Sequence, residues 1–133
     1  MQYNFEKRSM AYFVDIIIAF ISACLYVVFA PSSDSISFIN NISRVFMFHT
    51  LFFFVYCFFC YVVFNGITIG RLIFGTAIRN KDFTRMSIAT CAIRALLQAF
   101  IPFSLLNVAY MFINRTEESL FNKATNTISI YWR

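Results

Sequence analysis

The sequence predicts an all-α membrane protein with three main hydrophobic segments and a short amphipathic helix at the membrane interface. Of its 133 residues, 60% are hydrophobic and only 13% are charged, whereas about a quarter of the residues in soluble domains are charged. The apolar residues gather in three long blocks, and the basic residues lie mostly between these blocks, as in membrane proteins. Because no repeat or low-complexity linker divides the chain, we expect one domain over residues 1–133.

The first apolar block covers residues 10–30 and follows a polar N-terminus. At about 1.5 Å per residue, a helix of this length crosses a hydrocarbon layer of about 30 Å. A signal peptide that is cleaved near Cys24 is the alternative. Asp15 interrupts the apolar run and the run continues past Cys24 to Ala30, which favours a retained membrane helix. Pro31 and the serine-rich residues after it are expected to end the helix.

The second block, residues 45–64, is apolar on all sides and is therefore predicted to span the membrane. It contains Cys57 and Cys60 at a spacing that can indicate zinc or redox chemistry. No second pair of cysteine or histidine residues accompanies them, so we interpret both as small apolar side chains. We therefore predict neither a metal site nor a cofactor.

Residues 66–80 are predicted to form a short helix in the headgroup layer, because Ile69, Leu72 and Ile73 share one helical face. Gly66 and Gly70 are four residues apart, a spacing that allows close backbone packing. A phosphate-binding loop is the alternative, but the required spacing of glycine and lysine is absent. The bases in and after this segment are candidates for contact with lipid headgroups: Arg71, Arg79, Lys81 and Arg85.

The third block, residues 86–113, is less apolar than the first two and contains Arg94 and Pro102. Proline inside a helix kinks or breaks it. The block is too short for two crossings, which need about forty residues, so it either crosses once or turns back at Pro102 as a re-entrant element. The polar tail, residues 114–133, ends in an alternating segment typical of a strand.

The distribution of positive charge predicts the orientation. Basic residues are frequent before the first block and in residues 65–85, whereas residues 31–44 contain only Arg44. The positive-inside rule therefore places the N-terminus and residues 65–85 in the cytoplasm. The side of the tail depends on the third block. A re-entrant block would put the tail in the cytoplasm, which improves the charge asymmetry and is the interpretation that we favour.

Two motifs precede the third block. The first is Arg8-x-x-Ala11-x-x-x-Asp15, at the entry to the first apolar block. The second is Gly66-Ile-Thr68-Ile-Gly70-Arg71-x-x-x-Gly75, directly after the second block. A third element is Arg94 near the head of the third block, and the tail contains Ser-Leu-Phe-Asn-Lys-Ala-Thr-Asn-Thr at residues 119–127.

In order and spacing, these motifs resemble those of the RDD family of small bacterial membrane proteins, which is named for one arginine and two aspartates. The resemblance covers nearly the whole chain. It implies a location in the bacterial cytoplasmic (inner) membrane, with transport in some members and accessory roles in others. One departure concerns the closing motif, where Phe121 and Asn122 stand in place of the family's usual histidine and aspartate. A role that needs a second carboxylate is therefore in doubt.

An unpaired charge within a bilayer costs several kcal/mol, so Asp15 requires a partner. Arg8 lies on the same helical face but about 10 Å along the axis. We therefore expect Asp15 to pair with a base from another segment, Arg94 or Arg71, and we favour Arg94. This pair would either lock the helices in register or form an ion or proton site.

Three functions remain open. The first is a non-enzymatic accessory or scaffolding subunit, because three blocks cannot enclose a transport path and would have to join a homo-oligomer or another membrane protein. The second is a homo-oligomeric cation/proton exchanger that uses Asp15. The third is binding of anionic lipid. No nucleophile–base pair or cofactor motif indicates an enzyme, and a basic chain without a soluble core does not indicate nucleic-acid binding.

Overall fold

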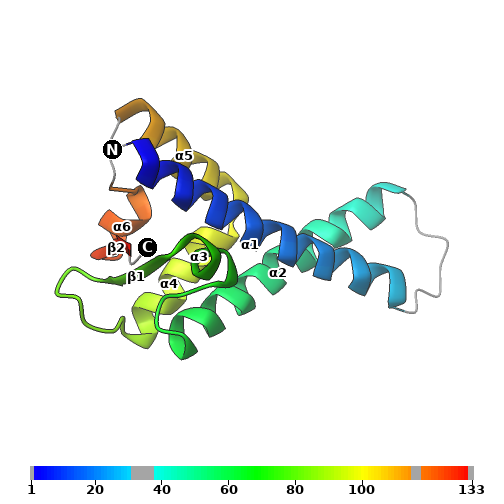
Figure 1. Ribbon diagram of the computed structural model, residues 1–133. Helices are drawn as coiled ribbons and strands as arrows, with labels where there is room; N and C mark the ends of the chain where they lie inside the picture. Colours follow the sequence, from blue (N-terminus) through cyan, green and yellow to red (C-terminus); the bar gives the residue numbers. More distant parts are fainter. Residues whose placement is uncertain (1, 31–37, 115–117, 132–133) are drawn as a thin grey trace.

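The computed structural model describes residues 2–30, 38–114 and 118–131. Its longest part is a hairpin of two helices, α1 (Gln2–Phe29) and α2 (Phe38–Val63), which lie side by side (Figure 1). Both are long and apolar enough to cross a membrane, which confirms the first two predicted segments. Residues 31–37 of the expected connection lie outside the described part of the chain, as do Arg115 and Arg133 of the tail.

The third block forms two helices, α4 (Ile88–Ala99) and α5 (Ile101–Asn114), whose axes meet at 89°. The break is at Phe100 rather than at Pro102. Pro102 is the second residue of α5, in the first turn, where a missing N–H leaves no helical hydrogen bond unmade. Near the break, the carbonyl of Gln98 accepts hydrogen bonds from Ser104 Oγ (2.9 Å) and the Tyr12 hydroxyl (3.1 Å). These bonds satisfy backbone that a membrane would not hydrate.

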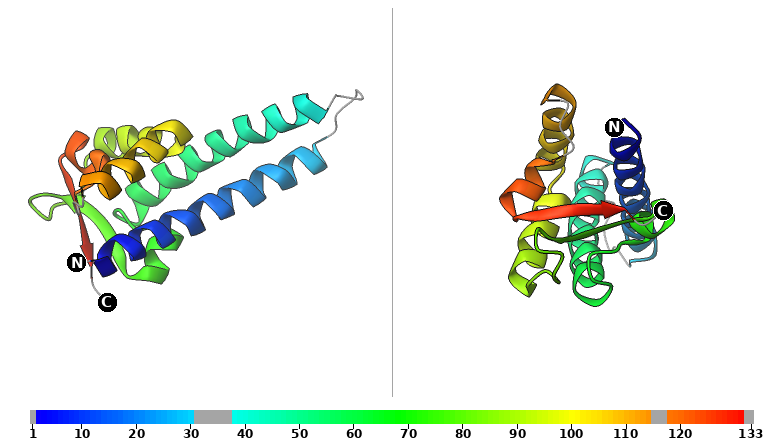
Figure 2. Two further views of the ribbon diagram at one scale, coloured as in Figure 1. Left: turned by 90° about the horizontal axis from the view of Figure 1, so that it is seen from above. Right: turned by 60° about the vertical axis from the view of Figure 1, so that its left-hand side comes forward.

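The α4–α5 pair is either a broken crossing or a re-entrant element by its length and composition. The two helices are about 18 Å and 21 Å long at 1.5 Å per residue, and each is shorter than the hydrocarbon layer. The chain enters and leaves the pair at the same end of the α1–α2 hairpin (Figure 2). Two helices of the described chain are thus long enough to span a membrane by themselves, or three segments if the bent pair counts as one.

Residues 66–80 do not form the single interfacial helix that was expected. A short helix, α3 (Ile69–Phe74), ends at Gly75, which has the left-handed conformation (φ 66°), and a strand, β1 (Thr76–Asn80), follows directly. The helical periodicity of the sequence ends at Phe74, because Gly75 terminates α3 after less than two turns. The prediction extended the helix past this glycine and so missed the strand. Gly75 adopts this conformation without the steric cost that a Cβ atom would bring.

The tail folds back onto this strand. It contains α6 (Leu120–Ala124) and β2 (Thr127–Tyr131), and β2 pairs antiparallel with β1, Thr76 opposite Tyr131 and Asn80 opposite Thr127. The strand expected from the alternation at 127–131 is therefore present. Because β1 follows the end of α2, this pairing places the tail at the same end of the hairpin as residues 65–85 (Figure 1).

Small side chains allow the helices to approach closely. Ala19, Cys57, Cys91 and Ala95 are buried between α1, α2 and α4, and Ala11 of α1 is buried beside α3. The tightest approach is at Gly70 of α3, where an added Cβ would lie 2.0 Å from the carbonyl oxygen of Ala11. Gly66 is similarly confined by the carbonyl oxygen of Ile78. The core is therefore thin, and most large apolar side chains of the long helices face outward.

We predict that Gly70→Ala destabilises the fold, because the new methyl group meets backbone of α1 rather than a movable side chain. Overpacking of this kind costs about 1–3 kcal/mol or more. Thermal unfolding of the purified protein in detergent measures the loss. Leu72→Ala, at an exposed position of the same helix, is the matched control and should change the unfolding temperature little. Equal unfolding temperatures for Gly70→Ala and the wild type would contradict the prediction.

Candidate functional site

The carboxylate of Asp15 is the centre of the first buried polar cluster, which we call the Asp15 cluster (Asp15, Tyr56, Thr68 and Gly70). Asp15 is 0% exposed. Its Oδ1 accepts hydrogen bonds from the Tyr56 hydroxyl (2.8 Å) and the Gly70 N–H (2.9 Å), and its Oδ2 accepts one from Thr68 Oγ1 (2.5 Å). Three donors from two other elements thus satisfy the carboxylate in place of water.

Local sequence explains why α3 presents these donors. Thr68 is the N-cap of α3, and its hydroxyl oxygen accepts a hydrogen bond from the Arg71 N–H while its hydrogen is donated to Asp15. The Gly70 N–H belongs to the first turn, whose amides have no helical acceptor. The Tyr56 hydroxyl in turn accepts from the Ile69 N–H (2.9 Å). Asp15 therefore holds the beginning of α3 against α1, where the helix dipole favours a negative charge.

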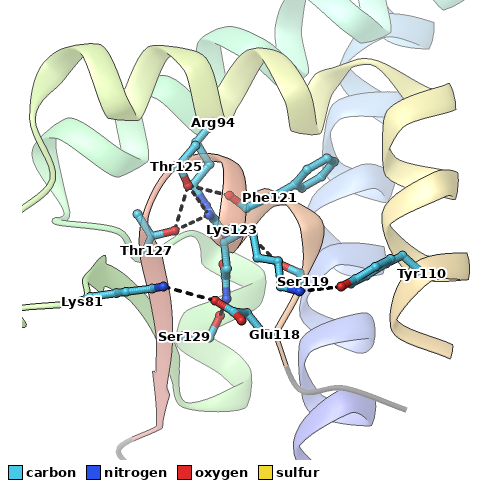
Figure 3. Close-up of polar contacts among 11 residues, drawn as sticks. Lys81, Arg94, Tyr110, Glu118, Ser119, Phe121, Lys123, Thr125, Thr127 and Ser129 are labelled. Atoms are coloured by element: carbon cyan, nitrogen blue, oxygen red, sulfur yellow. Dashed lines mark hydrogen bonds and ion pairs between the residues drawn. The ribbon is translucent and has the colours of Figure 1, made fainter. Parts of the chain in front are cut away.

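Arg94 is the centre of the second cluster, which we call the Arg94 cluster (Arg94, Asn122, Thr125 and Thr127). Its guanidinium group points from α4 toward α6 and β2 (Figure 3). Nη2 donates to Asn122 Oδ1 (2.6 Å), and Nη1 donates to Thr125 Oγ1 (3.0 Å) and Thr127 Oγ1 (2.5 Å). Arg94 is 2% exposed, and all three of these partners are uncharged. The cluster ties the tail to α4.

The expected ion pair between Asp15 and Arg94 is wrong. Each group has its own set of partners, and no nitrogen of Arg94 or Arg71 lies within 4 Å of the Asp15 carboxylate. Neutral donors from α3 and α2 take the place of the cation. The sequence argument considered only charged partners, although hydroxyl and backbone N–H groups also satisfy a buried carboxylate.

Arg71 does not share a surface with the other bases that were expected to contact lipid headgroups. It is 6% exposed, whereas Arg79 is half-buried and Lys81 and Arg85 are exposed. Nε and Nη1 of Arg71 are buried without a hydrogen-bond partner. Lys81 instead forms an ion pair with Glu118 (3.4 Å), which joins the loop after β1 to the tail (Figure 3).

Lys123 of α6 also fixes the tail, by a contact with α5. Its Nζ donates to the Tyr110 hydroxyl of α5 (2.6 Å) and lies 5.1 Å from the centre of the Tyr110 ring. This hydrogen bond raises the pKa of Lys123 above its ordinary value. Lys123 therefore joins the closing motif to α5, whereas the buried Arg94 joins it to α4.

Sequence reasoning missed several residues of these clusters. The hydroxyl of Tyr56 donates to Asp15. Tyr61 donates to the side chain of Gln98 in the core. The pattern of Thr68 followed by a short helix is an N-cap signal and identifies this residue as a donor, but no sequence signal indicates that α1 supplies its acceptor.

The family model of the RDD family matches residues 4–126. The chain belongs to the RDD family. Neither the curated proteins nor the solved structures that were searched gave a match. The matched range contains the whole Asp15 cluster and, except for Thr127, the Arg94 cluster, so Asp15, Arg94 and Asn122 lie within the RDD domain.

We predict that the effects of Asp15→Asn and Arg94→Gln on the free energy of unfolding are additive. Each substitution should destabilise the protein by about 2–5 kcal/mol, because each leaves buried partners unsatisfied. The two clusters share no hydrogen-bond partner, so the double variant should equal the sum within about 0.5 kcal/mol. Asp15→Asn combined with Tyr56→Phe should be non-additive, because those two side chains bond directly. Denaturant unfolding in detergent measures both cycles, and strong coupling between Asp15 and Arg94 would contradict the separation described here.

Asn122→Asp tests whether the lack of a negative partner for Arg94 lowers the stability of the protein. The substitution places a carboxylate at the atom that accepts from Nη2, and a charge-assisted hydrogen bond is about twice as strong as a neutral one. We expect higher stability near neutral pH. Arg94 should hold the pKa of the new carboxyl in the folded protein below its value in the unfolded chain. The gain in stability is therefore present above the unfolded pKa of this carboxyl and is lost as pH falls through its folded pKa. Asn114→Asp, at an exposed end of α5, is the control, and an equal gain in that variant would refute the explanation.

Proposed function

We propose that this RDD protein is a non-enzymatic accessory or scaffolding subunit of a bacterial membrane assembly. The observation that carries the proposal is the state of Asp15. The carboxylate that an exchanger would need to titrate is fully buried, and both of its oxygens are bound by donors that hold α3 in place. Its chemistry is thus used for structure, as in the register lock considered from the sequence.

The size of the fold supports the same function. The described chain has two helices that are long enough to cross a membrane. The bent pair lies beside only the part of this hairpin that is near the sheet. The buried core between α1, α2 and α4 is made largely of small and aromatic side chains. A path for ions across the membrane would therefore need further subunits, and large exposed apolar residues on α1, α2, α4 and α5 offer surfaces for them.

We further propose a multi-pass arrangement in the cytoplasmic membrane with the N-terminus in the cytoplasm. The basic residues at the sheet end of the hairpin include Arg8, Arg71, Lys81 and Arg94, whereas Arg44 lies near the opposite end, close to the start of α2. The positive-inside rule then places the sheet, α6 and both described chain ends on the cytoplasmic side.

Photocrosslinking in native membranes tests the accessory function. A photoreactive residue is placed at one exposed position of each long or bent helix, and at buried Phe53 as the control. The four positions are Phe13, Phe59, Leu96 and Phe112. We expect one face to crosslink to a protein, either a second copy or a single partner, while the other positions crosslink to lipid and Phe53 gives no intermolecular product. Lipid products at all four positions would contradict the proposal.

Proteoliposome flux tests the exchanger directly. Vesicles that contain the purified wild type, a trapped pH-sensitive dye and an imposed pH gradient receive Na⁺ or K⁺. We expect the gradient to decay no faster than in empty vesicles, because Asp15 has no access to water. Cation-dependent decay that is lost in folded Asp15→Asn protein would overturn the accessory function and establish exchange.

A further inference from the structure

A small cavity lies between α1, α3, α4, α5 and α6, and we call it the arginine cavity. Its volume is about 50 Å³. Three arginines line it, Arg8 from α1, Arg71 from α3 and Arg94 from α4, although these residues are far apart in the sequence. No acidic residue lines it in the part of the chain that the structure describes. The fold therefore gathers positive charge around an internal space.

The charges of Arg71 and Arg94 lack a counter-ion among the described residues. Both side chains are more than nine-tenths buried. Two nitrogens of Arg71 and the Nε of Arg94 have no hydrogen-bond partner. The remaining bonds of Arg94 go to neutral oxygens. A buried charge without a counter-ion costs several kcal/mol, so an anion in the cavity would remove a large unfavourable contribution.

The size and the donors of the cavity fit a phosphate group. One water needs about 10–15 Å³ of such space, so about 50 Å³ holds three to five water-sized groups, which is the size of one tetrahedral oxyanion. Guanidinium groups match phosphate oxygens with paired N–H donors. Asn107 also lines the cavity, and its Oδ1 accepts from the Phe121 N–H (3.3 Å). Its amide nitrogen is thereby left as a further donor.

An apolar cavity of about 160 Å³ adjoins the arginine cavity. The two share Tyr12, Ser104 and Val108, and the second is otherwise lined mainly by apolar and aromatic residues such as Ile16 and Phe53. A ligand with a phosphate at one end and a hydrocarbon chain at the other fits this pair of spaces. The arrangement lies at the basic end of the hairpin, where lipid headgroups meet the protein in the proposed orientation.

We propose that the arginine cavity binds a phosphate-class oxyanion, with Arg71 and Arg94 as its cationic partners. The ligand is either the phosphodiester headgroup of an anionic phospholipid or free inorganic phosphate. This site is distinct from an exposed basic surface, because Arg71 and Arg94 are interior residues. It does not depend on the accessory function, since a subunit of any assembly, or an exchanger, could hold such a ligand.

The test measures the thermal unfolding temperature of purified, delipidated protein in an uncharged detergent at constant ionic strength. The probes are inorganic phosphate against chloride, and short-chain phosphatidylglycerol against short-chain phosphatidylcholine. We expect phosphatidylglycerol to raise the unfolding temperature of the wild type in a saturable manner. Saturation by inorganic phosphate alone would identify the free ion as a sufficient ligand, and stabilisation by phosphatidylglycerol only would identify the lipid.

Arg71→Gln is the decisive variant, because it removes a buried charge that has few hydrogen bonds to lose. Without ligand it should be at least as stable as the wild type, and its apparent affinity for the phosphate-bearing probe should fall at least tenfold. Arg71→Lys should recover part of this affinity. Arg44→Gln, at an exposed position near the opposite end of the hairpin, is the matched control and should bind like the wild type.

Two results would overturn the proposal. One is stabilisation of the wild type by phosphate-bearing probes that does not exceed that by chloride or phosphatidylcholine. The other is equal affinity of the wild type and folded Arg71→Gln protein. Native mass spectrometry from nanodiscs of mixed phosphatidylglycerol and phosphatidylcholine gives an independent readout. There, when the lipid is the ligand, a retained phosphatidylglycerol should be present on the wild type and Arg44→Gln and absent from Arg71→Gln.

Discussion

The contact between the Asp15 carboxylate and the beginning of α3 organises the rest of this structure. A carboxylate within a membrane helix is tolerated only when polar groups replace its hydration. Here Thr68, Gly70 and Tyr56 provide those groups. By holding α3 against α1, the contact also sets where β1 begins. The sheet, and through it the tail, therefore depend on one buried acid in the first helix.

Much of the architecture could be predicted from the sequence, because a membrane imposes strong rules on composition. Apolar blocks of sufficient length identified α1 and α2, whereas the orientation that the charge asymmetry indicates stays a prediction. The break in the third block was expected, but the prediction attributed it to Pro102. In the structure Pro102 only begins α5, and hydrogen bonds from Ser104 and Tyr12 to the Gln98 carbonyl make the bend possible.

The candidate site was predicted less well than the fold. Asp15 was recognised as an unusual charge and Arg71 and Arg94 as candidate partners for it, and all three are buried. Their partners could not be predicted, because the choice among hydroxyl, amide and charged groups depends on distances between segments that are far apart in the chain. Asn122 was identified as a departure from the family motif, but only the structure places it on Arg94. The absence of a carboxylate at that position leaves the positive charge of Arg94 to neutral oxygens.

The Arg94 cluster has a consequence for how the protein is made. Its oxygen acceptors lie 28–33 residues after the arginine, so α4 is synthesised before they are. Until they arrive, the guanidinium group has to remain in contact with water or headgroups. The packing of α4 against the tail is therefore completed only after the final strand has been synthesised.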